Sequence, residues 1–187
     1  MNEVLETIAK RSSIRAYKAD KLTDTEIKTL ITAGLQAPTA RNMQEVHISV
    51  IDGDNPILKE IDTQRKLTML AAAPDEETKA KIESNPNNFY YSAPTVLVLS
   101  ADKDFKWNKL DSGIAAENIA LAAQSMGLVS LIIGIIDDAM RGEKKDYFAK
   151  ALQFPDNYEF AIAVAVGHRD TEKEQHEIDF DKSVSFI

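Results

Sequence analysis

Two arginines lie four residues apart in the segment RSSIR, with the hydroxyl groups of Ser12 and Ser13 between Arg11 and Arg15. Guanidinium groups and hydroxyls together supply the hydrogen-bond donors that a phosphate monoester binds. The same residues also suit a solvated helix end, because arginine near a helix C-terminus complements the helix dipole. The segment therefore predicts either a phosphate site or a solvated helix end.

Two side-chain amides, Asn42 and Gln44, stand at the end of the polar stretch APTARNMQ, just before the apolar run VHISVI. Each amide offers donors and an acceptor, which match a ring edge that alternates carbonyl and N–H groups. The alternative is that they cap the loop through their own backbone. The pair is a candidate for binding a polar heterocycle.

Composition excludes several other kinds of site. The net charge of -8 comes from interleaved acids and bases, so no basic stripe predicts a nucleic-acid partner. The absence of cysteine removes disulfides, thiolate nucleophiles and iron–sulfur ligation. The histidines lack ligand spacing, so no metal is expected, and no Gly-x-Ser-x-Gly, dinucleotide fingerprint or P-loop is present. Any redox chemistry would have to come from a bound cofactor.

Carboxylates are also candidates, because Asp111 and Glu117 share one predicted helix. With charged neighbours in the same segment, however, the pattern favours a solvated helix face over a catalytic pair. No catalytic side chain is therefore assigned.

The elements that would position these residues follow from apolar periodicity and turn residues. Thr23 and Glu26 have capping-box spacing before a helix that Pro38 closes. Residues 57–88 are predicted to be helical in parts, with Pro74 and SNPNN as breakers. The other expected helices cover Val4 to Ile8, Asn108–Met126 and Asp137–Leu152, and the expected strands are VHISVI, SAPTVLVLS, LVSLII and YEFAIAVAVG.

In the helix expected over Asn108–Met126, one face would carry Ile114, Asn118, Leu121, Ala122 and Ser125. The apolar strands show too little alternation to face water, which predicts a single α+β domain, residues 1–187, whose sheet is covered by helices. The N-terminus is unlike a signal peptide and no apolar run approaches the length of a membrane span, so a cytoplasmic protein without membrane contact is expected.

The tail, residues 171–187, is polar and acidic but finishes with Val184, Phe186 and Ile187. An apolar end on a polar segment needs a surface that buries it, on its own domain or on a second chain. The alternative is a frayed terminus.

Five motifs occur in an order that resembles the nitroreductase-like family of FMN-dependent NAD(P)H oxidoreductases, in its short-chain type. They are RSSIRAY at 11–17, APTARNMQ at 37–44, SAPTVLVL at 92–99, DSGIAAENIALAAQSMGL at 111–128 and IIGI at 132–135. The resemblance implies a nitroreductase-like α+β fold with a mainly antiparallel central sheet. It also implies a homodimer that exchanges C-terminal arms and binds FMN at the subunit interface.

The resemblance assigns residues to the phosphate end of FMN. The phosphate and ribityl chain would be held by Arg11, Ser12, Ser13 and Arg15. A further phosphate contact would come from Arg169, with Lys173 or Lys182 as alternatives.

The resemblance also assigns residues to the ring end. The loop formed by Pro38, Thr39 and Ala40 would reach the flavin of the other subunit. The amides of Asn42 and Gln44 would lie near the flavin or the substrate. The backbone of Ile133 and Gly134 would lie beside the isoalloxazine ring, since glycine has no side chain to keep the backbone away from it.

The implied activity is transfer of electrons from NADH or NADPH through the flavin to a nitroaromatic, a quinone or a related small electrophile. One departure bears on the pocket: many family members have Pro-Trp where this chain has Glu45 and Val46. Two other functions remain open, a non-turnover FMN-binding storage or sensor protein and an interaction domain without cofactor.

Overall fold

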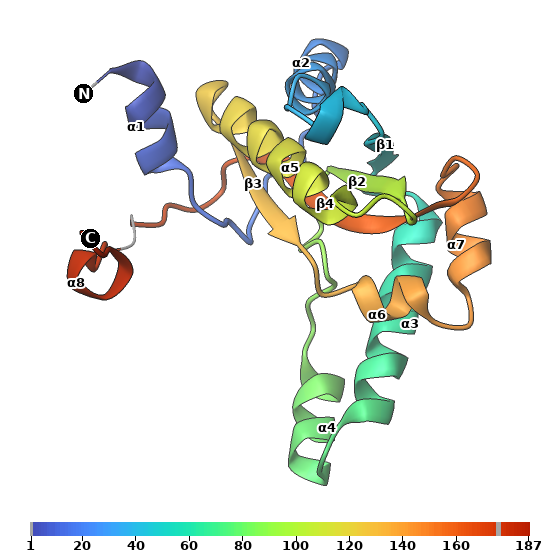
Figure 1. Ribbon diagram of the computed structural model, residues 1–187. Helices are drawn as coiled ribbons and strands as arrows, with labels where there is room; N and C mark the ends of the chain where they lie inside the picture. Colours follow the sequence, from blue (N-terminus) through green and yellow to red (C-terminus); the bar gives the residue numbers. More distant parts are fainter. Residues whose placement is uncertain (1, 175–176) are drawn as a thin grey trace.

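The computed structural model describes residues 2–174 and 177–187, and its centre is a four-stranded antiparallel sheet with the order β1-β2-β4-β3 (Figure 1). The strands are β1 (His47–Asp52), β2 (Thr95–Asp102), β3 (Leu128–Ile133) and β4 (Tyr158–His168). Each strand predicted from sequence is present, and the predicted α+β class is confirmed.

Helices cover both faces of the sheet. On β2, Val96 and Val98 point into a core shared with α3 (Pro56–Ala72), α6 (Asp137–Arg141) and α7 (Lys145–Ala151). Leu97 and Leu99 point the opposite way, into a core shared with α2 (Asp24–Leu35) and α5 (Asn108–Ser125). Successive side chains alternate between the faces of a strand, so a strand buried on both faces reads as an unbroken apolar run. The predicted coverage of the sheet by helices is confirmed.

Two predicted helices are present, and each begins at a residue whose side chain caps it. Helix α1 (Glu3–Lys10) begins at Asn2, whose side chain accepts a hydrogen bond from the backbone N–H of Leu5. Helix α2 begins with the predicted capping box, in which Thr23 and Glu26 satisfy each other's backbone N–H groups.

The buried face of α5 differs from the predicted one. The residues packed against the sheet and α2 are small or polar ones together with Ile119: Asn108, Asp111, Ser112, Ala115, Ala116, Ile119, Ala120 and Ala123. The predicted face, from Ile114 to Ser125, lies at the margin of this contact instead. Alanines bring the helix axis close to the strands, so the closest-packed side of the helix carries only one large apolar side chain, Ile119.

Two helical segments are interrupted. Residues 57–88 form α3 and α4 (Glu76–Ser84), which extend away from the sheet and are separated at Pro74, as predicted (Figure 1). The segment predicted to be helical from Asp137 to Leu152 is two helices, because Gly142 ends α6 with an extended backbone (ψ -162°).

The tail carries a short helix, α8 (Phe180–Ser183), and in Figure 1 it lies on the same side of the molecule as α1. Its apolar side chains are open to solvent in the single chain: Ile178, Phe180, Val184, Phe186 and Ile187. Residues 175–176 of the predicted arm fall outside the described part. Within the described ranges, no helix combines the length and apolar content needed to cross a bilayer.

Candidate functional site

Residues 11–18, which we call the N-terminal strap, lie along the sheet between α1 and α2. The backbone N–H of Ile14 donates to the carbonyl of Ser130 on β3, at 3.0 Å. At its other end the strap reaches β4, where Lys18 N–H donates to the carbonyl of His168 and Tyr17 forms a bridge with Arg169. The structure therefore brings the predicted phosphate residues of the strap next to the chain at Arg169.

The cations of this region are held loosely. Arg11 Nε lies 3.6 Å from Glu117 Oε1, in a pair whose side chains are 22% and 44% exposed. The Arg15 guanidinium is exposed and lies 5.9 Å from the centre of the Tyr91 ring. Arg169 pairs with Glu172 at 3.0 Å and donates to Gln124 at 3.3 Å. Partly exposed pairs of this kind contribute about 0–1 kcal/mol, so an incoming phosphate can replace the carboxylate partners.

Tyr17 stiffens the strap and was not predicted as a site residue. Its hydroxyl donates to the carbonyl of Ile14 at 2.9 Å. Burial raises the pKa of Tyr17 well above its ordinary value, so the hydroxyl keeps its proton and the bond persists over the ordinary pH range.

The end of β3 presents open backbone. Ile133 is buried, whereas Gly134 is exposed, and a Cβ added at Gly134 would meet only Ile162 Cδ1, at 3.7 Å. Along β3, Gly134 is four residues beyond Ser130, about 13 Å from the strap contact. The predicted phosphate and ring-facing segments thus lie along one edge strand.

Residues 38–45, which we call the amide loop, contain a strained turn. Arg41, Asn42 and Gln44 have φ angles of 57°, 55° and 54°, which non-glycine residues rarely adopt. The turn includes the short 3₁₀ helix η1 (Ala40–Asn42). Both amide side chains are exposed, and Gln44 Nε2 lies 3.4 Å from Asn42 Oδ1. Strain of this kind persists only where surrounding contacts fix it, and it is common at binding sites.

Thr39 and Asp111 fix this turn. The hydroxyl of Thr39 accepts from Gln44 N–H at 2.9 Å, and its carbonyl accepts from Asn42 N–H at 2.9 Å. Asp111 Oδ2 accepts from Ala40 N–H at 2.8 Å. The predicted solvation of Asp111 is wrong, since it is only 2% exposed, whereas Glu117 is half exposed as expected. Asp111 is thus buried where α5 meets the amide loop, whose Ala40 is 71 positions away in sequence.

A single chain does not gather all the predicted residues in one place. The amide loop is attached to α5 at Asp111, whereas Arg11 of the strap contacts this helix at Glu117 and Arg169 contacts it at Gln124. Along the helix, at 1.5 Å per residue, Glu117 lies about 9 Å and Gln124 about 20 Å from Asp111. The predicted phosphate group and the predicted amide group therefore form two separate clusters on this chain.

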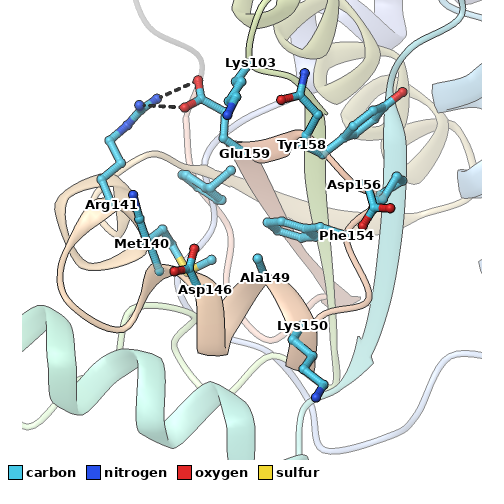
Figure 2. Close-up of a pocket in the computed structure, with 14 residues that line it drawn as sticks. Lys103, Met140, Arg141, Asp146, Ala149, Lys150, Phe154, Asp156, Tyr158 and Glu159 are labelled. Carbon is cyan, nitrogen blue, oxygen red and sulfur yellow. Dashed lines mark hydrogen bonds and ion pairs between the residues drawn. The ribbon is translucent and has the colours of Figure 1, made fainter.

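A pocket of about 660 Å³ lies elsewhere, between α6, α7 and the start of β4 (Figure 2). Figure 2 shows Phe154 inside it and Arg141 forming two hydrogen bonds with Glu159, at 2.9 and 3.2 Å. Arg141 also pairs with Asp137 at 2.9 Å, so its charge is already compensated. No predicted site residue lines this pocket. In the part of the chain that the structure describes, no group of three or more His, Cys, Asp or Glu side chains is placed to hold a metal ion.

Comparison with known proteins places this geometry in a family. A sequence model described as the Nitroreductase family matches residues 8–168. The chain is 29% identical over 182 residues to a Bacillus subtilis protein named FMN reductase (NADPH), covering 90% of this chain and 66% of that protein, about two thirds of its length.

Solved structures agree with the sequence match. A nitroreductase with bound FMN from Desulfitobacterium hafniense superposes with a TM-score of 0.88 at 30% identity, covering 100% of this chain and 99% of the other. A nitroreductase with bound FMN from Bacteroides fragilis superposes with a TM-score of 0.86 at 25% identity, covering 100% of both chains. The family and fold that the five motifs predicted are confirmed, and the chain belongs to the nitroreductase family.

Proposed function

We propose that this protein is an FMN-dependent oxidoreductase that takes electrons from NADH or NADPH and passes them to a nitroaromatic, a quinone or a related small electrophile. The observation that carries the proposal is the cationic strap packed against β3, the strand that ends at the open backbone of Gly134. The printed names of the relatives support the cofactor and the electron donor.

In this proposal, the strap residues hold the phosphate and the ribityl chain. Arg11 and Arg15 provide charge, Ser12 and Ser13 provide neutral donors, and Arg169 lies beside the strap as a further cation. A dianionic phosphate is bound most strongly by charge-assisted hydrogen bonds. Glu117 and Glu172 would release their arginines when the phosphate enters.

The ring would lie along the end of β3. The backbone of Ile133 and Gly134 can approach an aromatic plane there, because the side of Gly134 where a side chain would stand is open. When bound, FMN would supply the hydride chemistry, which the side chains of this protein do not provide. The protein's own residues would orient the ring and leave one face open for the nucleotide and then for the acceptor.

The amide loop would serve the flavin of a partner chain. The residues of the amide loop belong to a cluster that is attached to α5 at Asp111, about 20 Å along the helix from the Gln124 contact of Arg169. In a homodimer the same loop can meet the other chain's ring, where the amides offer donors and acceptors to its polar edge.

Exposed apolar side chains support the homodimer. Helix α1 exposes Val4, Leu5 and Ile8, and the first turn of α5 and its N-terminal flank expose Trp107 and Leu110. The tail exposes further apolar side chains on the α1 side of the molecule (Figure 1). Surfaces of this kind on a small domain indicate contact with another chain. We propose that residues 171–187 form an arm that packs on the partner, and that the protein acts in the cytoplasm, where a cysteine-free chain is at no disadvantage.

The test is a visible spectrum of the purified protein, before and after addition of FMN and then of NADH or NADPH without oxygen. Flavin bands that bleach with the nucleotide, followed by turnover with a quinone or a nitrofuran, are expected. Flavin bands that resist bleaching would favour a storage or sensor protein. No bound flavin after addition of FMN would refute the cofactor assignment.

A further inference from the structure

Glu45 closes the amide loop with a side chain that is only 6% exposed. Neither of its carboxyl oxygens has a hydrogen-bond partner among the described residues, and no other buried side-chain nitrogen or oxygen in that part of the chain lacks one. A buried carboxylate without donors carries a desolvation cost of several kcal/mol, and such groups normally neutralise instead. Glu45 therefore needs an explanation that does not leave it as an isolated anion.

The group within hydrogen-bonding reach of Glu45 is the carboxyl of Asp111 on α5. The other charged group that acts on Glu45 is Asp102, at the end of β2, which is also an acid. At the start of β4, burial is the main cause that raises the pKa of Tyr158, and the charges of Asp102 and Glu45 raise it further. On its own segment, Arg41 is exposed, and burial lowers the pKa of His47, which disfavours a charged imidazole there. The neighbours thus add negative potential around Glu45.

Two carboxyl groups can hydrogen bond to each other only if one of them carries a proton. Asp111 Oδ2 already accepts the Ala40 N–H, at 2.8 Å, whereas the oxygens of Glu45 accept from nothing. We propose that Glu45 is protonated in the folded protein and donates this proton to Asp111, so that the carboxyl of Asp111 holds both ends of the strained amide loop. Glu45 is then a positioning residue, which acts on the loop through Asp111.

The hydrogen bond between Glu45 and Asp111 would fix the strained turn of the amide loop. Asp111 is tied to residue 40 through the backbone amide and to residue 45 through the shared proton, and the three residues with positive φ lie between these two anchors. Without the second anchor, the turn would be free to relax toward ordinary backbone angles. The shared proton therefore keeps Asn42 and Gln44 in their exposed positions.

The protonated Glu45 makes the stability of the folded protein depend on pH. Burial is the main cause that raises the pKa of Glu45 above its ordinary value, and Asp111 raises it further. A raised pKa in the folded state means that the contribution to stability is complete below the ordinary pKa. The contribution is lost as the pH rises from the ordinary pKa through the folded one, and between these two values the folding equilibrium constant falls by up to about tenfold per pH unit. Alkaline conditions should therefore loosen the amide loop.

The experiment compares the wild type with Glu45→Gln, a neutral side chain of the same shape, in urea unfolding between pH 5 and pH 9. The wild type should lose stability as the pH rises, and Glu45→Gln should lose less in the same window. Glu83→Gln, an exposed glutamate on α4, is the matched control and should follow the wild type. Asp111→Asn, whose amide can donate to an ionised Glu45, should also flatten the profile. Parallel pH profiles for the wild type and Glu45→Gln would overturn the proposal.

A second measurement needs no variant. In the wild type labelled with ¹³C at the glutamate carboxyls, one glutamate should titrate at a higher pH than the others. If every glutamate titrates at or below the ordinary pKa, Glu45 is not protonated and the proposal is wrong.

The link to flavin rests on the proposed function. FMN affinity of the wild type should fall as the pH rises through the Glu45 titration, and that of Glu45→Gln should not follow it. If the protein binds no FMN at any pH, the proposed function fails while the unfolding and ¹³C measurements still decide the role of Glu45. If FMN binds with the same pH profile in both proteins, the shared proton does not position the loop for flavin.

Discussion

Replacing Arg11 by alanine is the sharpest test of the phosphate site. A charge-assisted hydrogen bond contributes a net 1.5–3 kcal/mol, or about 10- to 150-fold in Kd. In the free protein Arg11 Nε lies 3.6 Å from Glu117, and this half-exposed pair is worth at most about 1 kcal/mol. The wild type must break that pair to bind phosphate and the variant does not, so the expected loss of FMN affinity is about 0.5–3 kcal/mol, or about 2- to 150-fold.

The assay is titration of the protein, after removal of any bound flavin, with FMN, followed by flavin fluorescence, with riboflavin as a second ligand. Riboflavin lacks the phosphate, so Arg11→Ala should leave its affinity unchanged. Glu117→Gln frees Arg11 from its partner and should tighten FMN binding by up to about fivefold. Arg141→Ala removes an arginine that is paired with Asp137 and Glu159 in the pocket of Figure 2, and FMN affinity should not respond to it.

Two results would refute the reasoning. Equal losses for FMN and riboflavin would show that Arg11 supports the fold of the site and not the phosphate. Unchanged FMN affinity in both Arg11→Ala and Glu117→Gln would show that the phosphate binds elsewhere.

Three further predictions concern stability and assembly. Thr23→Ala should lower the free energy of unfolding in urea by about 1 kcal/mol, because it removes the cap of α2. Hydrogen bonds from Thr23 lower the pKa of Glu26, so the capping contribution is present above the ordinary pKa and is lost as the pH falls through the lowered one. A destabilisation that does not shrink on acidification would contradict this account. Asp62→Ala should lower the free energy of unfolding by about 3–5 kcal/mol, since it leaves Arg65 buried without its partner 2.8 Å away. Adding Arg65→Met should recover part of this stability. If the double variant is no more stable than Asp62→Ala, the unpaired arginine is not the cause of the loss. Truncation after Glu177 should weaken the dimer and FMN binding in sedimentation and titration experiments, and an unchanged flavin-loaded dimer would show that the arm is dispensable.

The sequence predicted the elements that local signals define. Strand positions followed from apolar runs, and the start of α2 followed from Thr23 and Glu26, because a capping box lies within four residues. The buried face of α5 could not be predicted, since Ile119 is its only large apolar side chain and the other buried residues are alanines, asparagine, aspartate and serine. The end of α6 at Gly142 depends on one glycine within an otherwise helical pattern, which is a weak signal.

Part of the candidate site was likewise predictable from the sequence, and part was not. The residues of the strap are neighbours in sequence, so their grouping was visible as RSSIR. The burial of Asp111 and Glu45 results from contact between segments that are far apart along the chain. A sequence pattern does not encode such contacts, and the strand order β1-β2-β4-β3 was not predictable from periodicity either.

The position of the strap on β3 also bears on solubility. β3 is an edge strand of the sheet, and its sequence LVSLII has no charge and no proline. A free edge of this composition is a template for pairing with other chains and for aggregation. Ser13 and Ile14 occupy part of that edge through Ser130. Under the proposed function, FMN would hold this cover in place, so a shortage of the cofactor in the cell would lower the yield of soluble protein as well as its activity.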